Sequence, residues 1–73
     1  MASLSTSQYD ALERAITDGR RIAVQRPGAG EVVVLPRRLR LVGGRELIEA
    51  AHPTTGDRLT LYIDEILGFE VVK

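Results

Sequence analysis

The sequence contains no cysteine and a single histidine, His52. Without cysteine the chain forms neither a disulfide framework nor a thiolate zinc site, so its core must suffice alone or with a partner subunit. Nucleophilic catalysis needs a base beside a nucleophile, and one histidine before Pro53 at a predicted strand end leaves the usual catalytic groups incomplete. The sequence therefore predicts a binding protein with no catalytic residues rather than an enzyme.

Long apolar runs are also absent. No stretch approaches the ~20 residues that span a bilayer, and residues 1–8 lack the basic start and apolar run of a signal peptide. We expect a cytoplasmic protein on these grounds.

Aromatic residues make up 4% of the chain, whereas hydrophobic residues make up 44% and charged residues 27%. This composition is ordinary for a globular domain and predicts a core of Leu, Ile and Val. A chain of 73 residues has room for one domain, and a domain of this size buries only about 60% of the surface that its unfolded form exposes. We expect one domain over residues 1–73, with modest stability.

Charge is balanced overall but unevenly distributed. The formal net charge is zero, yet residues 20–45 carry +6 and residues 46–73 carry −4. Strands from the two segments that lie side by side would neutralise one another. Alternatively, the arginines line one face that binds phosphate or carboxylate, since the guanidinium fork suits bidentate oxyanions.

The first element is predicted to be a helix over about residues 7–18. Ser7 followed by Asp10 resembles a capping box, the apolar residues Tyr9, Leu12 and Ile16 fall on one stripe, and Gly19 ends the element. Asp10 and Glu13 are then expected in the first turn, where the helix dipole favours negative charge.

After Gly19 the apolar period changes to two, which predicts strands over about residues 20–26, 31–42, 45–52, 58–63 and 68–72. Residues 27–30 form a glycine-rich turn between the first two strands, and Pro36 bends the second strand or marks an edge. The predicted class is therefore mainly β (α+β), a helix followed by five strands of a strongly bent antiparallel sheet.

Gly43-Gly44 predicts a two-residue hairpin turn, which fixes the pairing of the strands on either side. Arg38 is placed opposite Glu49 and Arg37 opposite Ala50. One face then carries the predicted core residues Leu39, Leu41, Ile48 and Ala50. The other face carries residues predicted to point outward, namely Arg38, Arg40, Arg45 and Leu47.

No metal site or cofactor is expected. His52 is interpreted as a solvated turn residue, and the adjacent Asp64 and Glu65, which we expect to point in different directions, as the end of a strand. The glycines of residues 27–30 precede a strand, whereas a phosphate-binding loop needs a following helix.

The quoted segments resemble those of Sm-like small barrels, and of two relatives in particular. For the WYL regulatory domain the similarity runs from about Leu12 to Ile66, through "ALERAITDGRRIAV", "LPRRLRLVGGRELIEA" and "AAHPTTGDRLTLYIDEI", with Glu46-Leu47-Ile48 at the position of its Trp-Tyr-Leu. This resemblance implies an Sm-like or SH3-like barrel and a regulatory binding role.

The second relative is the Rof family of small proteins that inhibit the Rho termination factor. "YDALERA" is similar to its first helix, "RELIEAA" to its central strand and "LYIDEILGF" to its closing strand. The resemblance implies binding to Rho and relief of termination, with Asp10 and Glu13 as the residues carried over to contact the protein partner.

Three functions stay open at this point. The first is a regulator that binds a protein of the transcription or RNA-processing machinery. The second is a module that binds nucleic acid or a nucleotide-like anion through Arg38, Arg40 and Arg45, with Leu47 and Tyr62 as apolar neighbours. The third is a structural subunit without ligand, in which Arg38 pairs with Glu49. Exposed edge strands in a small barrel also favour a homo-oligomer.

Overall fold

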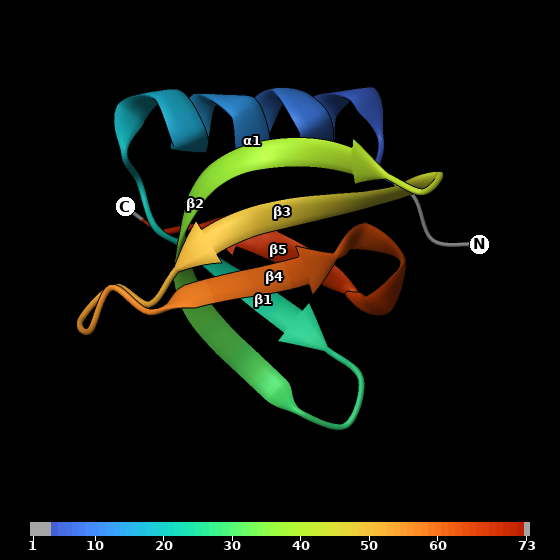
Figure 1. The fold of residues 1–73 in the computed structure, drawn as a ribbon. Coiled ribbons are helices and arrows are strands. Elements are labelled where there is room, and N and C mark those ends of the chain that lie inside the picture. The colour runs from blue at the N-terminus through green and yellow to red at the C-terminus, as the bar shows by residue number, and fades with distance from the viewer. Residues whose placement is uncertain (1–3, 73) are drawn as a thin grey trace.

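The computed structural model describes residues 4–72, so the ends of the predicted domain, residues 1–3 and 73, lie outside the described residues. One helix precedes five strands, as the sequence predicted (Figure 1). The elements are α1 (Thr6–Asp18), β1 (Ile22–Arg26), β2 (Gly30–Val42), β3 (Arg45–Ala51), β4 (Arg58–Tyr62), a short 3-10 helix η1 (Ile63–Glu65) and β5 (Gly68–Val71).

The strands form one antiparallel sheet in the order β4-β3-β2-β1-β5. The long, curved β2 belongs to both halves of the sheet, pairing with β1 along its first part and with β3 along its second (Figure 1). Within residues 4–72 the two edge strands, β4 and β5, do not pair with each other, so the sheet is not closed and the predicted Sm-like barrel, which we expected to be partly open, is not confirmed.

The N-cap of helix α1 lies two residues before the cap predicted at Ser7. Ser5 is the N-cap: its hydroxyl accepts a hydrogen bond from the Gln8 amide, and the Gln8 side chain accepts one from the Ser5 amide. The predicted cap at Ser7 is therefore wrong. Asp10 and Glu13 consequently lie beyond the first turn, which contains no acidic residue, and the predicted dipole role fails.

The predicted end of α1 is confirmed. Gly19 adopts a left-handed conformation with φ of 67°, and the next amide, that of Arg20, donates to the Ala15 carbonyl at 2.9 Å. Because this contact completes the helix, β1 begins at Ile22 rather than at residue 20.

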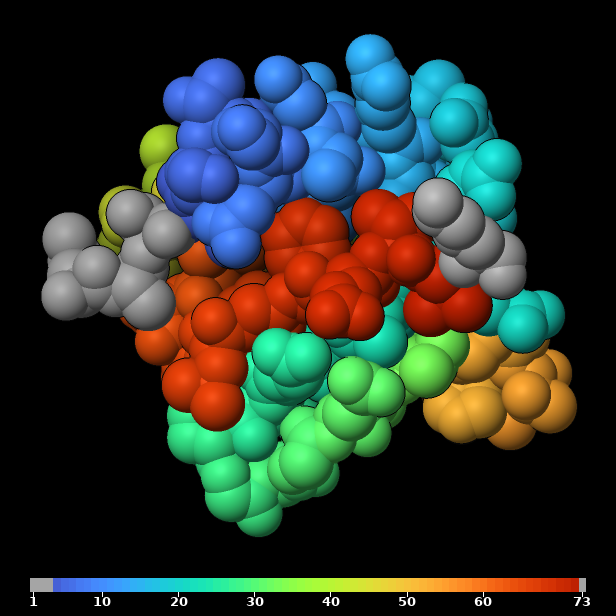
Figure 2. All heavy atoms as spheres, turned by 180° about the vertical axis from the view of Figure 1, so that it is seen from behind, coloured from blue at the N-terminus to red at the C-terminus, as the bar shows by residue number. Residues whose placement is uncertain are grey.

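The core lies between the concave side of the sheet and α1, which contacts β2 and β5. Figure 2 shows from behind that α1, in blue, lies directly over β5, in red. The buried cluster consists of aliphatic residues only, as the composition predicted: Leu12, Ala15, Ile22, Val24, Val34, Ile48, Ala50, Leu61, Ile63 and Ile66.

The Gly43-Gly44 turn is confirmed, with both glycines at positive φ, 58° and 79°. The pairing of β2 with β3 follows the prediction from Val42 opposite Arg45 down to Arg38 opposite Glu49. Below that point the prediction is wrong, because a β-bulge places Pro36, not Arg37, opposite Ala50. Arg37 is the extra residue of the bulge.

Two leucines were assigned to the wrong environment. Leu41, a predicted core residue, is 70% exposed, because the hairpin extends past the buried cluster. Leu47, predicted to face outward, is 6% exposed, and its cross-strand neighbours are the long side chains of Arg40 and Tyr62. Strict alternation therefore predicts the face on which a residue lies better than its burial.

Candidate anion-binding groove

The outward face of β2, β3 and β4 carries rows of side chains set by the strand register. One row is Arg38–Glu49–Thr60, and in the next row Ala51 pairs with Arg58. Ala51 is small and 6% exposed, so the face is hollowed beside Glu49. The hollow has a volume of about 570 Å³, and we call it the arginine groove; it is lined by Arg37, Arg38, Arg40, Glu49, Ala50, Ala51, Gly56, Arg58, Leu59 and Thr60.

Four arginines line this groove from two different strands. Arg38 and Arg40 alternate along β2 and so share a face, whereas Arg37 lines the same groove because the bulge at Pro36 re-aims it. Arg58 comes from the start of β4, on the other side of β3. With Glu49 as the one acid of the lining, the groove carries a formal charge of +3.

Glu49 lies on β3, between β2 and β4, and its carboxylate contacts two of the four arginines. Its Oε2 accepts a hydrogen bond from Nη1 of Arg40 at 2.7 Å, and its Oε1 lies 3.7 Å from Nε of Arg38. The hydrogen bond from Arg40, together with the charges of Arg40, Arg38 and Arg58, holds the pKa of the Glu49 carboxyl below its usual range.

The other two arginines have no such partner. Neither Arg37 nor Arg58 has a carboxylate oxygen within 4.0 Å of its guanidinium among residues 4–72. Both side chains are exposed. Among residues 4–72, the groove therefore has two arginines that share the single negative charge of Glu49 and two that have no carboxylate partner.

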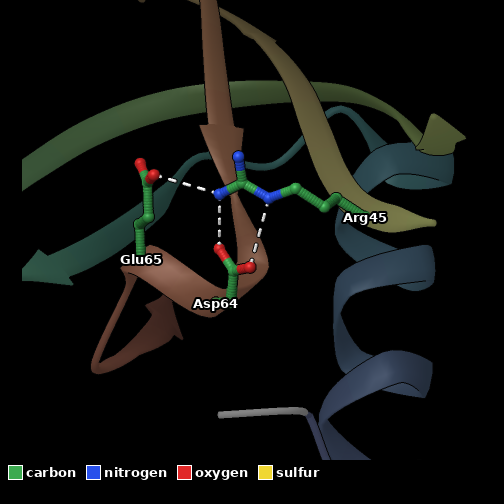
Figure 3. A network of polar contacts seen from close by, with 3 residues as sticks. All are labelled: Arg45, Asp64 and Glu65. Atoms are coloured by element: carbon green, nitrogen blue, oxygen red, sulfur yellow. Dashed lines mark hydrogen bonds and ion pairs between the residues drawn. The ribbon is translucent and has the colours of Figure 1, made fainter. Parts of the chain in front are cut away.

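Arg45 belongs to a separate cluster at the start of β3 (Figure 3). Its Nε and Nη2 donate to the two oxygens of Asp64 at 3.2 and 2.8 Å, and Nη2 also donates to Glu65 at 3.0 Å. These hydrogen bonds lower the pKa of Asp64 and raise that of Arg45. Asp64 and Glu65 follow the end of β4 and belong to η1, and their carboxylates converge on one guanidinium rather than diverging as predicted.

Tyr62 belongs to the same cluster. The Arg45 guanidinium carbon lies 3.9 Å from the centroid of the Tyr62 ring, which is a cation–π contact. One face of the Tyr62 ring is thus covered by the Arg45 guanidinium. Of the five residues predicted to form an anion site, Arg38 and Arg40 lie in the arginine groove, whereas Arg45, Leu47 and Tyr62 do not line it.

The residues predicted to contact a protein partner lie on α1. Asp10 and Glu13 are both exposed and line a shallow hollow of the helix surface with Arg14, Thr17 and Asp18. This hollow belongs to a different element from the arginine groove, so the structure separates the two predicted sites.

His52 lies in the loop between β3 and β4 and is exposed, as expected of a turn residue. Its Nδ1 accepts hydrogen bonds from the amides of Thr54 and Thr55, at 3.1 and 3.2 Å. Among the described residues no three acidic or histidine side chains gather as a metal site would require. No helix in the described part of the chain is long and apolar enough to cross a membrane.

Sequence reasoning missed Arg37 and Arg58 as groove residues. The signal for Arg58 was present in the sequence, since Arg58, Thr60 and Tyr62 alternate with the apolar residues Leu59, Leu61 and Ile63. Arg37 carried no such signal, because a simple alternating register assigns it to the opposite face from Arg38.

The sequence matches no protein family model and no curated protein. The fold is similar to part of the proteasome accessory factor B/C (PafBC) of Arthrobacter aurescens, with a TM-score of 0.72 and 19% sequence identity. The alignment covers 97% of this chain and 12% of the PafBC chain. PafBC contains a WYL domain, so the likeness supports the distant resemblance to that domain at the level of the fold. The resemblance to Rof is not confirmed by it.

Proposed function

We propose that this protein is a small regulatory binding module, not an enzyme, whose arginine groove binds a phosphate-bearing ligand of the nucleotide or nucleic-acid class. The observation that carries the proposal is the gathering of four arginines around one hollow, two of them without a carboxylate partner among residues 4–72. Unpaired guanidinium groups on one face favour an anionic ligand over a purely structural role.

The chemistry of the lining suits phosphate. A guanidinium presents planar pairs of N–H donors that match phosphate oxygens bidentately. Ligand sites usually have volumes of about 300–1,000 Å³, and the groove, at about 570 Å³, falls in that range. The arginines come from β2 and β4, with β3 between them, so the sheet holds them on a rigid scaffold.

Base stacking contributes little in this proposal. The groove lining contains no aromatic residue, and Tyr62 already stacks with Arg45. Proteins that bind single strands without sequence preference stack the bases on exposed aromatic side chains. Recognition here therefore depends on phosphate charge and geometry.

The regulatory part of the proposal is supported by the fold alone. A module of this fold within PafBC, an accessory factor by name, fits a role in binding rather than in turnover.

The test is the affinity for a fluorescein-labelled, 5′-phosphorylated single-stranded oligonucleotide, measured by fluorescence anisotropy. The wild type is compared with the double variant Arg38→Glu, Arg40→Glu and with a matched control, Arg14→Glu, Arg21→Glu, which makes the same charge change on exposed residues outside the groove. We expect the groove variant to lose at least about tenfold in affinity, about 1.4 kcal/mol, and the control to lose much less. An equal loss in both variants would contradict a localised site.

A second candidate is contact with a protein partner through Asp10 and Glu13, as in a Rof-like modulator of transcription termination. It is favoured by the exposure of both carboxylates in one hollow of α1, away from the arginine groove. Capture of Rho from lysate after nuclease treatment, lost in Asp10→Ala, Glu13→Ala and retained in the groove variant, would favour this candidate instead.

A further inference from the structure

In the part of the chain that the structure describes, Glu49 is the only acid that lines the arginine groove. Its carboxylate contacts Arg40 at 2.7 Å and Arg38 at 3.7 Å, and its side chain is 36% exposed. It lies on β3, directly between Arg38 of β2 and Thr60 of β4. Glu49 therefore occupies the position at which an anionic ligand would meet Arg38 and Arg40.

A ligand that binds all four arginines competes with this carboxylate for Nη1 of Arg40, which donates to it, and for the nearby charge of Arg38. A phosphodiester carries one negative charge, as does a carboxylate. Replacing the Glu49 carboxylate by a phosphodiester therefore adds little binding free energy at Arg38 and Arg40. A terminal phosphate carries a charge of about −1.5 to −2 at neutral pH and has three strong acceptor oxygens. It therefore offers these two arginines more charge and more acceptors than Glu49 does.

We propose that Glu49 is an internal competitor that makes the arginine groove selective for terminal phosphate groups over phosphodiesters. The inference rests on the proposed function, because it presupposes that the groove binds phosphate. Arg37 and Arg58 bind any phosphate. Replacement of the Glu49 carboxylate at Arg38 and Arg40 then distinguishes a terminal phosphate from a phosphodiester. The ligand class is then a nucleotide or a nucleic-acid end that bears a terminal phosphate.

The ionisation of the ligand gives an independent consequence. The second pKa of a terminal phosphate is near 6. Its negative charge therefore increases between about pH 5 and pH 7.5, whereas the negative charge of a phosphodiester stays constant. The titratable side chains that line the groove are Glu49 and the four arginines. Glu49 is already ionised in this range, since its pKa lies below its usual value. The preference for terminal phosphate should therefore increase with pH.

The experiment uses three labelled probes: a trinucleotide with a 5′-hydroxyl, the same trinucleotide with a 5′-phosphate, and a tetranucleotide with a 5′-hydroxyl. The last probe adds one phosphodiester instead of a terminal phosphate. Affinities are measured for the wild type, for Glu49→Gln and for Glu31→Gln, which removes the same charge from an exposed position of β2 outside the groove.

We expect the wild type to bind the 5′-phosphorylated probe at least about tenfold more tightly than the tetranucleotide. In Glu49→Gln the hydroxyl-ended probes should bind more tightly, and the discrimination should fall below about threefold. Glu31→Gln should discriminate as the wild type does. The proposal would be overturned if the wild type bound the 5′-phosphorylated trinucleotide and the tetranucleotide with equal affinity. It would also be overturned if Glu49→Gln discriminated between these two probes as strongly as the wild type does.

The two failures are distinguishable. If the proposed function is wrong, none of the probes binds the wild type through Arg38 and Arg40. If only the role of Glu49 is wrong, the probes bind there without preference for the terminal phosphate. The wild-type comparison needs no variant, so the proposal stays testable even if Glu49→Gln does not fold.

Discussion

The dependence of phosphate binding on salt follows from the pairing of the four groove arginines. For single strands, log K falls by about 0.7 per unit of log[salt] for each phosphate contact. If only Arg37 and Arg58 bind phosphate, the slope is about −1.4. If Glu49 also releases Arg38 and Arg40, the slope is about −2.8. Between about 50 and 200 mM salt, these slopes correspond to losses of about 7-fold and 50-fold in affinity.

The assay is fluorescence anisotropy with a 5′-phosphorylated single strand of about 12 nucleotides, within the length that single-strand sites cover. Affinities are compared over the same salt range for the wild type and for Arg58→Gln, which removes one free guanidinium from the groove. The slope should become shallower by about 0.7 in that variant. Arg21→Gln, exposed and outside the groove, is the matched control.

Two results would refute this reasoning. A wild-type slope shallower than about −0.7 means that at most one arginine meets phosphate. An equal change of slope in Arg58→Gln and Arg21→Gln means that the ligand senses net charge rather than the arginine groove.

The remaining predictions concern the fold and the ion pairs. Ile48→Ala, at a fully buried position, should cost about 2–5 kcal/mol in urea unfolding, and a cost below about 1 kcal/mol would contradict its place in the core. Ser5→Ala should cost about 1 kcal/mol through loss of the N-cap, whereas Ser7→Ala, inside α1, should cost less than about 0.5 kcal/mol; the reverse order would restore the cap predicted from sequence. The pKa of Glu49 is lower in the folded state than its ordinary value of 4.5, so its contribution to stability is complete above about pH 4.5 and is lost as pH falls through the lower folded value. Arg40→Gln should raise the pKa of the Glu49 carboxyl in an NMR titration, and an unchanged pKa would show that the hydrogen bond is not formed.

Much of the fold could be predicted because its signals are local. The Gly43-Gly44 turn fixed the register of β2 with β3, since two residues at positive φ leave few alternatives. The predicted helix stripe included Leu12, which is fully buried. The start of α1 was mispredicted at Ser7 with Asp10, although Ser5 with Gln8 fits the capping box, which has Glu or Gln at its last position, more closely.

The candidate site was predicted only in part, because its geometry depends on non-local features. Alternation placed Arg38 and Arg40 on one face but could not show that Glu49 holds both of them. Arg37 joins the groove through a bulge, and one extra residue reverses the face on which an arginine is expected. Arg45 does not join the predicted site because it donates hydrogen bonds to Asp64 and Glu65, which lie in the 3-10 helix η1 (Figure 3).

The central claim is that phosphate binds in the arginine groove, and an amide chemical-shift titration of the labelled protein with a 5′-phosphorylated oligonucleotide tests it most directly. The account predicts that the largest shifts occur at Arg37, Arg38, Glu49 and Arg58 on the outward face of β2, β3 and β4. Shifts confined to α1 around Asp10 and Glu13, or no saturable shifts in β2–β4, would contradict it.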